Sequence, residues 1–291
     1  MNKKEVPYGF GQVKWVSTDW LEEHLEDEEL MILDVQPDIH DYIKIHIPGA
    51  VYVSEKTLRV SLHGMPGKWI PPEAAQALFR RLGLRPELPV VVYTGKGLFK
   101  GWGDGLEQTM VAYSLVRFGH DNVYVLDGGL DKWLKEGRPA SQVFPKIEAS
   151  DFQATVRSEM FVSYDEFKRI KDEDDVVLLD ARPANVYAGE GPWIRNGHIP
   201  GAVNLPWASL MAADNPRLLK PKEEILRIVE EKGATKDKLI ICSCGTGREG
   251  TNEYILFKHF LGYPRVKLYE GSFTEWSSYP DNPIVVGESP R

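Results

Sequence analysis

The sequence predicts an α/β protein made of two tandem domains of one kind, each a small parallel sheet flanked by helices. Three observations support this fold class: a length of 291 residues, a duplication with a period near half the chain, and apolar runs that alternate with amphipathic segments. Since domains cluster near roughly 150 residues, the length suits two cores. A period of this size is too long for a solenoid repeat and indicates two homologous domains.

The duplication is visible in stretches that recur in the same order. WVSTDWLEEHLEDEELMILDVQP, from Trp15, resembles FVSYDEFKRIKDEDDVVLLDARP, from Phe161. HIPGAVYV, from His46, recurs as HIPGAVNL, from His198, and FGHDNVYVLDGGLDKW resembles LGYPRVKLYEGSFTEW. The joint between the copies is polar and contains two prolines, GRPASQVFPKIEASDFQATVRSEMF. The predicted division is an N-terminal domain over residues 1–145, a linker over 146–160 and a C-terminal domain over 161–291.

Each copy begins with a helix and a strand. Ser17 and Ser163 occupy N-cap positions with an acidic residue soon after, which predicts a helix start in both copies. A short apolar strand follows, at Met31–Val35 in the first copy and at Val176–Leu179 in the second. The HIPGA loop and another strand come next in each copy.

An amphipathic helix and a longer apolar strand complete each sheet. Ala75, Leu78, Phe79 and Leu82 lie at positions i, i+3, i+4 and i+7, and Ile225 begins the same pattern in the second copy. The apolar runs PVVVY, at 89–93, and KLIIC, at 238–242, read as strands. Continuous apolar strands alternating with helices are typical of a parallel sheet covered on both faces.

The strand ending at Cys242 leads into the bend Cys242-Ser243-Cys244, which holds both cysteines of the chain, and a helix is predicted from Thr251 to Leu261. Ligands of parallel sheets collect beyond the carboxyl ends of the strands. Glycines follow at 245, 247 and 250, and such a loop at a helix N-terminus aims its N–H groups at one point. We therefore predict a thiol whose pKa is lowered below its usual range.

Cys244 is the candidate nucleophile of this bend. It opens the glycine-rich loop, and Arg248 adds a fixed positive charge. Cys242 is still in strand register, so we expect it to be half-buried along the sheet. The alternative is that both are inert core residues, as free cysteines often are.

The first copy lacks this chemistry. Matching the apolar strands sets Gly95 against Cys244, and the first repeat sets Gln36 against Arg182, so the first copy has neither a thiol nor a strand-end arginine. We predict a catalytic second domain and an inactive first one. The first copy's loop is six residues longer, and the sequence leaves open whether its segment Gly97–Gly105 is a lid over the pocket or a dimer contact.

The composition argues against two classes of partner, nucleic acids and membranes. The net charge of −8 disfavours binding to nucleic acid, and the sequence has no run of about 18 apolar residues that would predict a membrane span. The first residues lack an apolar signal region, and two cysteines are too few for a disulfide framework, so we expect a cytoplasmic protein with reduced thiols. We expect no cofactor and no metal.

The doubled α/β unit, HIPGA in each copy, LDARP, a Cys-Gly-x-Gly loop and a C-terminal YEGSFTEW together resemble the two-domain rhodaneses. These are thiosulfate sulfurtransferases and 3-mercaptopyruvate sulfurtransferases. The resemblance implies that Cys244 attacks the outer sulfur of a donor such as thiosulfate, so that sulfite leaves and Cys244 carries a persulfide. A thiol or cyanide then takes the outer sulfur atom of this persulfide. The six residues of the family's catalytic loop correspond to Cys244, Gly245, Thr246, Gly247, Arg248 and Glu249.

The resemblance also implies which residues bind the donor. Arg182 in LDARP matches the family arginine that holds the anionic group, although a structural ion pair is the alternative. Arg195 is a weaker candidate for a second contact. His63 in SLHGMPGKW resembles a histidine of some mercaptopyruvate enzymes, but their upstream acidic residue is missing here. Because Glu249 replaces their serine or threonine, thiosulfate is favoured over 3-mercaptopyruvate.

Other classes of function stay open at this point. Cys242 to Arg248 also spells the Cys-x5-Arg of cysteine phosphatases, but no histidine precedes the cysteine and no serine or threonine follows the arginine. A sulfur carrier or redox sensor using both thiols is a second alternative. A metal site is disfavoured, because Cys-x-Cys without a nearby histidine falls short of four ligands.

Overall fold

The computed structural model describes residues 6–291, and the chain divides into two compact units. Each unit takes a short segment from the other half of the sequence, which the contiguous division predicted above does not include. The first unit comprises the described part up to Arg59, Trp69–Arg157 and Asp214–Leu219. The second comprises Val60–Lys68, Ser158–Ala213 and Lys220–Arg291.

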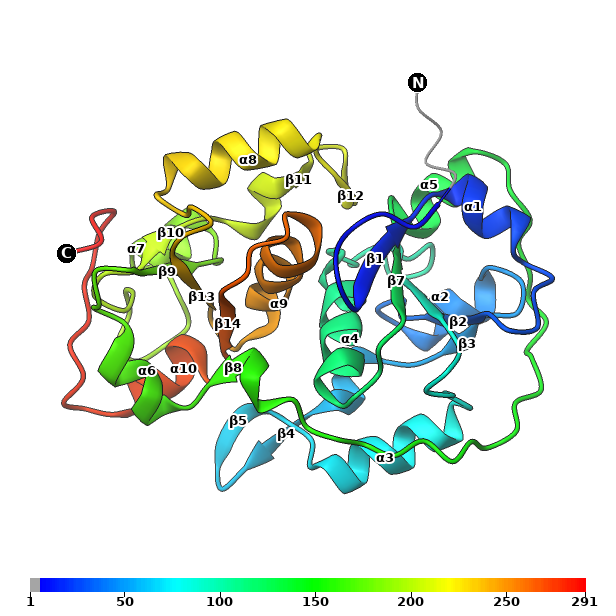
Figure 1. The fold of residues 1–291 in the computed structure, drawn as a ribbon, viewed down its shortest axis with the longest axis horizontal. Coiled ribbons are helices and arrows are strands. Elements are labelled where there is room, and N and C mark those ends of the chain that lie inside the picture. The colour runs from blue at the N-terminus through cyan, green and yellow to red at the C-terminus, as the bar shows by residue number, and fades with distance from the viewer. Residues whose placement is uncertain (1–5) are drawn as a thin grey trace. The chain divides into compact units, whose positions relative to one another are not determined.

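The first unit is built on a five-stranded parallel sheet in the order β1-β7-β6-β2-β3 (Figure 1). The predicted helix start at Ser17 is confirmed, because its hydroxyl accepts the Trp20 N–H. A strand before this helix was not predicted. The strands are β1 (Val13–Val16), β2 (Met31–Asp34), β3 (Val51–Tyr52), β6 (Val90–Tyr93) and β7 (Val123–Leu126). The helices are α1 (Thr18–Glu23), α2 (Ile39–Lys44), α3 (Pro72–Arg81), α4 (Leu106–Arg117) and α5 (Gly129–Lys135).

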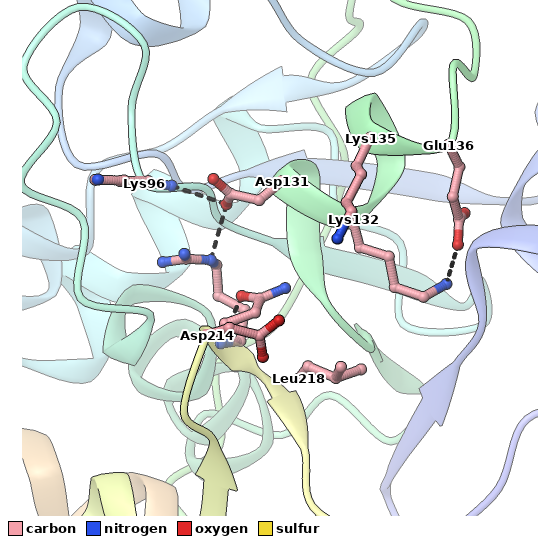
Figure 2. A pocket seen from close by; sticks show the side chains of 9 residues that line it. Lys96, Asp131, Lys132, Lys135, Glu136, Asp214 and Leu218 are labelled. Carbon is pink, nitrogen blue, oxygen red and sulfur yellow. Dashed lines mark hydrogen bonds and ion pairs between the residues drawn. The ribbon is translucent and has the colours of Figure 1, made fainter.

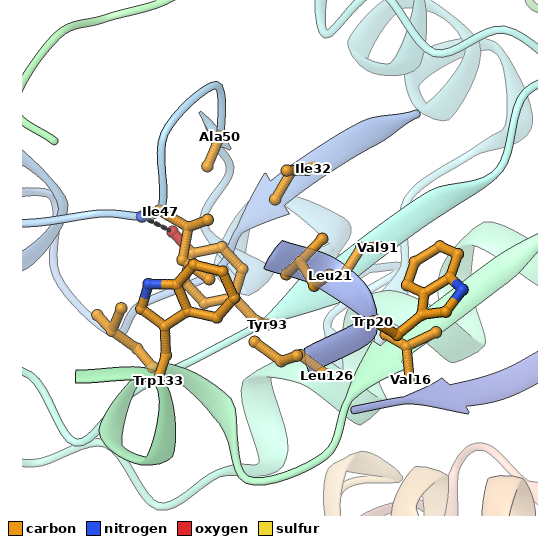
Figure 3. Packing of buried hydrophobic residues seen from close by; sticks show 11 residues of the cluster. Val16, Trp20, Leu21, Ile32, Ile47, Ala50, Val91, Tyr93, Leu126 and Trp133 are labelled. Carbon is orange, nitrogen blue, oxygen red and sulfur yellow. Dashed lines mark hydrogen bonds between the residues drawn. The ribbon is translucent and has the colours of Figure 1, made fainter. Parts of the chain in front are cut away.

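One face of this sheet is covered by α1 and α5, as Figure 3 shows for the buried cluster there. Trp20 from α1 and Trp133 from α5 pack against alternate strand residues such as Val91 and Tyr93. The neighbouring residues of β6 point to the opposite face, where α4 packs on β6 and β7. Both faces are therefore buried, as the continuous apolar strands predicted.

The second unit repeats this sheet in the order β8-β14-β13-β9-β10, again all parallel. Its core on one face involves α6, α7 and α10, while α9 packs against β13 and β14. The strands are β8 (Phe161–Val162), β9 (Val176–Asp180), β10 (Val203–Asn204), β13 (Leu239–Ser243) and β14 (Val266–Tyr269). The helices are α6 (Tyr164–Ile170), α7 (Ala184–Ala188), α8 (Lys222–Glu231), α9 (Arg248–Ile255), which continues as a π-helix over Leu256–Phe260, and α10 (Ser272–Ser278).

Two small strand pairs were not predicted. One consists of β4 (Arg59–Leu62) and β5 (Met65–Trp69), and Lys68 at its end forms an ion pair with Glu275 on α10 of the second unit. The other consists of β11 (Met211–Ala212) and β12 (Asn215–Leu219). Within residues 6–291, no helix is long and apolar enough to cross a membrane.

Candidate active site

The loop after β13 folds back onto the sulfur of Cys244. The strand ends at Ser243, and α9 begins at Arg248, three residues earlier than predicted. Gly247 is the N-cap of α9 with a φ of 86°, a left-handed conformation that favours glycine. Its N–H donates to the Cys244 Sγ at 3.0 Å. At least this one N–H group of the loop therefore points at the sulfur, as predicted.

The environment of the thiol is nevertheless the opposite of the one predicted. Cys244 is fully buried, and burial raises the pKa of its thiol well above the usual range. The carboxylate of Glu249, which hydrogen-bonds the thiol, raises this pKa further, while the Gly250 N–H lowers it. The prediction of a lowered pKa is therefore wrong, because it counted the loop dipoles without the cost of burial.

The start of α10 holds the other side of the loop. The Cys244 N–H donates to the Ser272 Oγ at 3.1 Å, and the Cys244 carbonyl accepts the Phe273 N–H at 2.9 Å. Ser272 has a φ of 50°, an uncommon conformation for a residue with a side chain. Sequence reasoning missed Ser272, although it stands in the quoted motif YEGSFTEW.

Trp193 forms a wall beside the loop. A Cβ on Gly245 would lie 2.9 Å from the Trp193 ring, so the backbone approaches the indole as closely as only glycine allows. The indole N–H donates to the Thr274 Oγ1 at 2.9 Å. Trp193 was missed because its neighbour Arg195 carried the sequence signal.

Arg182 lies at the end of β9, with its Cδ 3.7 Å from the position of that Cβ on Gly245. Its Nε and Nη2 donate to the Asp180 carboxylate at 2.9 and 2.6 Å, and Nη2 also donates to the Gly197 carbonyl at 3.0 Å. The structural ion pair considered from the sequence is therefore present. Nη1 is buried and has no hydrogen-bond partner in the described chain, so one N–H edge of the guanidinium is unused.

The first unit shows which side chain can make the same two structural bonds as Arg182. Gln36 occupies the equivalent position, and its Nε2 donates to Asp34 and to the Ile45 carbonyl, both at 2.9 Å. Ile45 precedes His46 as Gly197 precedes His198, so the amide makes the same two connections as the guanidinium. In the first unit a neutral side chain is enough, together with the Tyr93 hydroxyl that also bonds Asp34. In the second unit the charge of Arg182 pairs with Asp180, and Nη1 is the group that neither connection uses.

Thr94, and not Gly95, is the residue of the first unit that corresponds to Cys244. Tyr93 pairs with Asp34 as Ser243 pairs with Asp180, so the next residue in each strand is equivalent. The Thr94 carbonyl accepts the Leu130 N–H at 2.8 Å, as the Cys244 carbonyl accepts that of Phe273. The sequence alignment is wrong by one residue, because two apolar runs match equally well in neighbouring registers.

The other predicted residues divide into two groups. Thr246, Arg248 and Glu249 lie on the loop and the first turn of α9 beside Cys244. Arg195 donates instead to the carbonyls of Tyr279 and Asn282, which makes it an anchor for its own loop. His63 is exposed at the turn between β4 and β5 with a φ of 50°, and no interaction with Cys244 is seen among residues 6–291.

Both histidines of the repeated HIPGA motif have structural partners, in the copy with a thiol and in the copy without one. His46 and His198 are fully buried, and each ring lies between two backbone carbonyl oxygens.

Cys242 lies within β13, where it pairs with Leu179 and Leu268, and it is fully buried rather than half-buried. Burial raises the pKa of its thiol well above the usual range, and the Glu253 carboxylate adds to the rise. Both thiols are free. The residues that the structure describes contain no cluster of three or more histidine, cysteine or acidic side chains suited to a metal.

A cavity of roughly 460 Å³ lies in the first unit and contains none of the predicted site residues (Figure 2). Its lining carries both signs of charge, largely paired: Arg217 contacts Asp131 at 2.8 Å, and Lys132 contacts Glu136 at 2.7 Å. The segment Gly97–Gly105 precedes α4 and exposes Leu98, Phe99 and Trp102.

Comparison with known proteins supports this reading of the fold. Residues 17–136 and residues 163–279 each match the family described as Rhodanese-like domain. The thiosulfate sulfurtransferase of Azotobacter vinelandii is 35% identical over 91% of this chain and 94% of its own length. The sulfur carrier protein TtuD of Thermus thermophilus is 33% identical over 94% of this chain and 96% of its own.

The same relationship is seen among solved structures. The crystal structure of SseA from Escherichia coli, described as a 3-mercaptopyruvate sulfotransferase, is 29% identical. It superposes with a TM-score of 0.78 and covers 89% of this chain and 98% of its own. The two domain matches and these relatives show that the chain belongs to the rhodanese-like family, as a member with two tandem domains.

Proposed function

We propose that this protein is a sulfurtransferase that moves the outer sulfur of thiosulfate to a thiol or cyanide through a persulfide on Cys244. The observation that carries this proposal is the unpaired Nη1 of Arg182, a buried cationic donor at the edge of the Cys244 loop. An unsatisfied buried N–H costs about 1–3 kcal/mol. The ion pair with Asp180 uses only Nε and Nη2, so an anionic ligand beside the Cys244 loop would give Nη1 a partner.

The reaction divides into two displacements at sulfur. In the first, the Cys244 thiolate forms a bond to the outer sulfur of thiosulfate, the S–S bond of the donor breaks, and sulfite leaves with the electron pair. In the second, the acceptor forms a bond to the terminal sulfur of the persulfide and Cys244 leaves as a thiolate. The Gly247 N–H, at 3.0 Å from Sγ, stabilises the anionic sulfur in both. Two separate half-reactions predict ping-pong kinetics.

A preference for 3-mercaptopyruvate is the alternative donor specificity. It is favoured by one observation: the segment Val60–Lys68, which carries His63, groups with the unit that holds Cys244. Thiosulfate is favoured by Glu249, which stands where a hydroxyl side chain would be expected in the mercaptopyruvate enzymes. Measurement of His63→Ala separates the two, because only a mercaptopyruvate enzyme should lose activity.

The phosphatase alternative has little support. It needs Cys242 as the nucleophile, but that side chain is fully buried in the middle strand of the sheet and faces Glu253. An ionised Glu253 would repel an anionic phosphate, and a protonated Glu253 would supply no positive charge to bind it.

The proposal is tested by intact-mass measurement after incubation with thiosulfate or 3-mercaptopyruvate, together with steady-state rates. Wild type and Cys242→Ser should gain the mass of one sulfur atom and transfer it to cyanide. Cys244→Ser should do neither. A persulfide that still forms on Cys244→Ser would refute the assignment of the nucleophile.

A further inference from the structure

Two acid–thiol pairs lie between β13 and α9 in the second unit. Cys242 and Cys244 are two residues apart in an extended segment, so their side chains point to the same face of the sheet. Glu249 and Glu253 are four residues apart on α9, which packs on that face. The Glu249 side chain hydrogen-bonds the Cys244 thiol, and the Glu253 carboxyl acts on Cys242.

The first unit has a counterpart of the Cys244–Glu249 pair, with a threonine in place of the cysteine. Helix α4 begins after Gly105 as α9 begins after Gly247, so Glu107 is equivalent to Glu249. The Thr94 hydroxyl, at the position of Cys244, lies 3.3 Å from a Glu107 carboxylate oxygen and 3.2 Å from the Val35 carbonyl oxygen, both within reach of its one proton. The Gly105 N–H donates to the same carboxylate oxygen at 3.1 Å. A glutamate at the second residue of this helix therefore reaches the side chain at the strand end in both units.

The Cys242–Glu253 pair has no counterpart in the first unit. The residues equivalent to Cys242 and Glu253 are Val92 and Val111, both buried. The acid that is common to both units is thus the one beside the strand end, where a reacting side chain of the second unit would stand.

We propose that Glu249 is the general base that takes the proton of the Cys244 thiol as the sulfur attacks the donor, an inference that rests on the proposed function. In this step the S–H bond breaks, the proton passes to a Glu249 carboxylate oxygen, and the electron pair left on Sγ forms the bond to the outer sulfur of the donor. The donor's S–S bond breaks and sulfite leaves with its electron pair. The proton then stays on the carboxyl beside the anionic persulfide and can donate a hydrogen bond to it.

The charge around the thiol explains why a base is needed. Besides Glu249, the ionisable side chains near it are Asp180 and Arg182 after β9, Cys242 on β13 and Arg248 at the start of α9, and Glu253 lies one turn further along α9 beside Cys242. Arg182 is paired with Asp180, and burial opposes the thiolate. A free thiolate is therefore scarce at neutral pH, whereas proton transfer to Glu249 leaves the total charge of the pair unchanged.

Glu249→Gln distinguishes a base from a carboxylate that merely disfavours the thiolate. Removing the negative charge should shift iodoacetamide alkylation of Cys244 to lower pH, measured in the Cys242→Val background. Removing the base should nevertheless slow persulfide formation at pH 7 by on the order of 10²-fold, with recovery toward the wild-type rate in alkaline buffer. Glu249→Asp, which keeps the carboxylate on a shorter side chain, should be intermediate.

The matched control is Glu107→Gln, which makes the same change in the unit without a thiol and should leave persulfide formation unchanged. Equal or faster persulfide formation by Glu249→Gln at pH 7 would overturn the proposal. If wild type forms no persulfide with any donor, the proposed function itself fails, which distinguishes that result from a failure of the inference alone. An unchanged alkylation midpoint in Glu249→Gln would also overturn the inference, because the carboxylate would then not act on the thiol.

Discussion

The substitution Arg182→Gln tests the role of the strand-end arginine with the protein's own first unit as the reference. Gln36 shows that an amide at this position can bond both the buried aspartate and the neighbouring carbonyl. We therefore expect the variant to fold. What it loses is the positive charge and the buried Nη1, which has no partner in residues 6–291.

The expected loss in catalysis follows from that single group. A hydrogen bond to a charged partner contributes about 1.5–3 kcal/mol, which corresponds to roughly 10- to 150-fold in kcat/KM. Steady-state rates at several thiosulfate concentrations measure this, and the loss should appear mainly in KM. The matched control is Gln36→Ala, which should lower stability without changing KM. Unchanged kcat/KM in Arg182→Gln would show that the arginine is only structural.

The stability of the same variant should also change, and Asp34 of the first unit is the reference for a buried aspartate with an amide partner. Burial raises the pKa of Asp34, which has an amide partner, to about 6 from 3.8. The folded protein then binds more protons than the unfolded chain between these values, so stability falls as pH rises through this window and is level above it. Arg182→Gln would leave Asp180 with an amide partner but without the hydroxyl that Tyr93 donates to Asp34. We therefore expect the variant to be less stable than wild type at pH 7, measured by urea denaturation.

Two further predictions concern buried acids. Cys242→Val with Glu253→Val copies the first unit and removes a carboxyl whose two oxygens have no partner within the described residues, so stability should rise by roughly 2 kcal/mol while sulfur transfer to cyanide is retained. Lower stability in urea denaturation, or lost transfer, would contradict this. Asp34→Asn should abolish the native decline in stability between pH 4 and pH 6. A decline of unchanged size in the variant would mean that another group causes it.

The duplication, several helices and strands of each sheet and the position of the candidate site could be predicted from the sequence, because each depends on local patterns. Apolar periodicity predicts buried strands and helices, Ser17 and Ser163 cap helices through bonds to residues three positions away, and glycines mark the Cys244 bend. Residues 60–68, which group with the second unit, and residues 214–219, which group with the first, carry no such pattern. They group with the other unit through contacts between distant parts of the chain.

The sequence by itself determined that two units of one kind occur in tandem and that only one of them has a thiol at a strand end. Tertiary structure alone decided the electrostatics of that thiol. The burial of Cys244, the carboxyl of Glu249 against its sulfur and the pairing of Arg182 with Asp180 each depend on the packing of α9 and β9 around the loop. The balance between solvation and charge is set by those neighbours in space, which no linear spacing reveals.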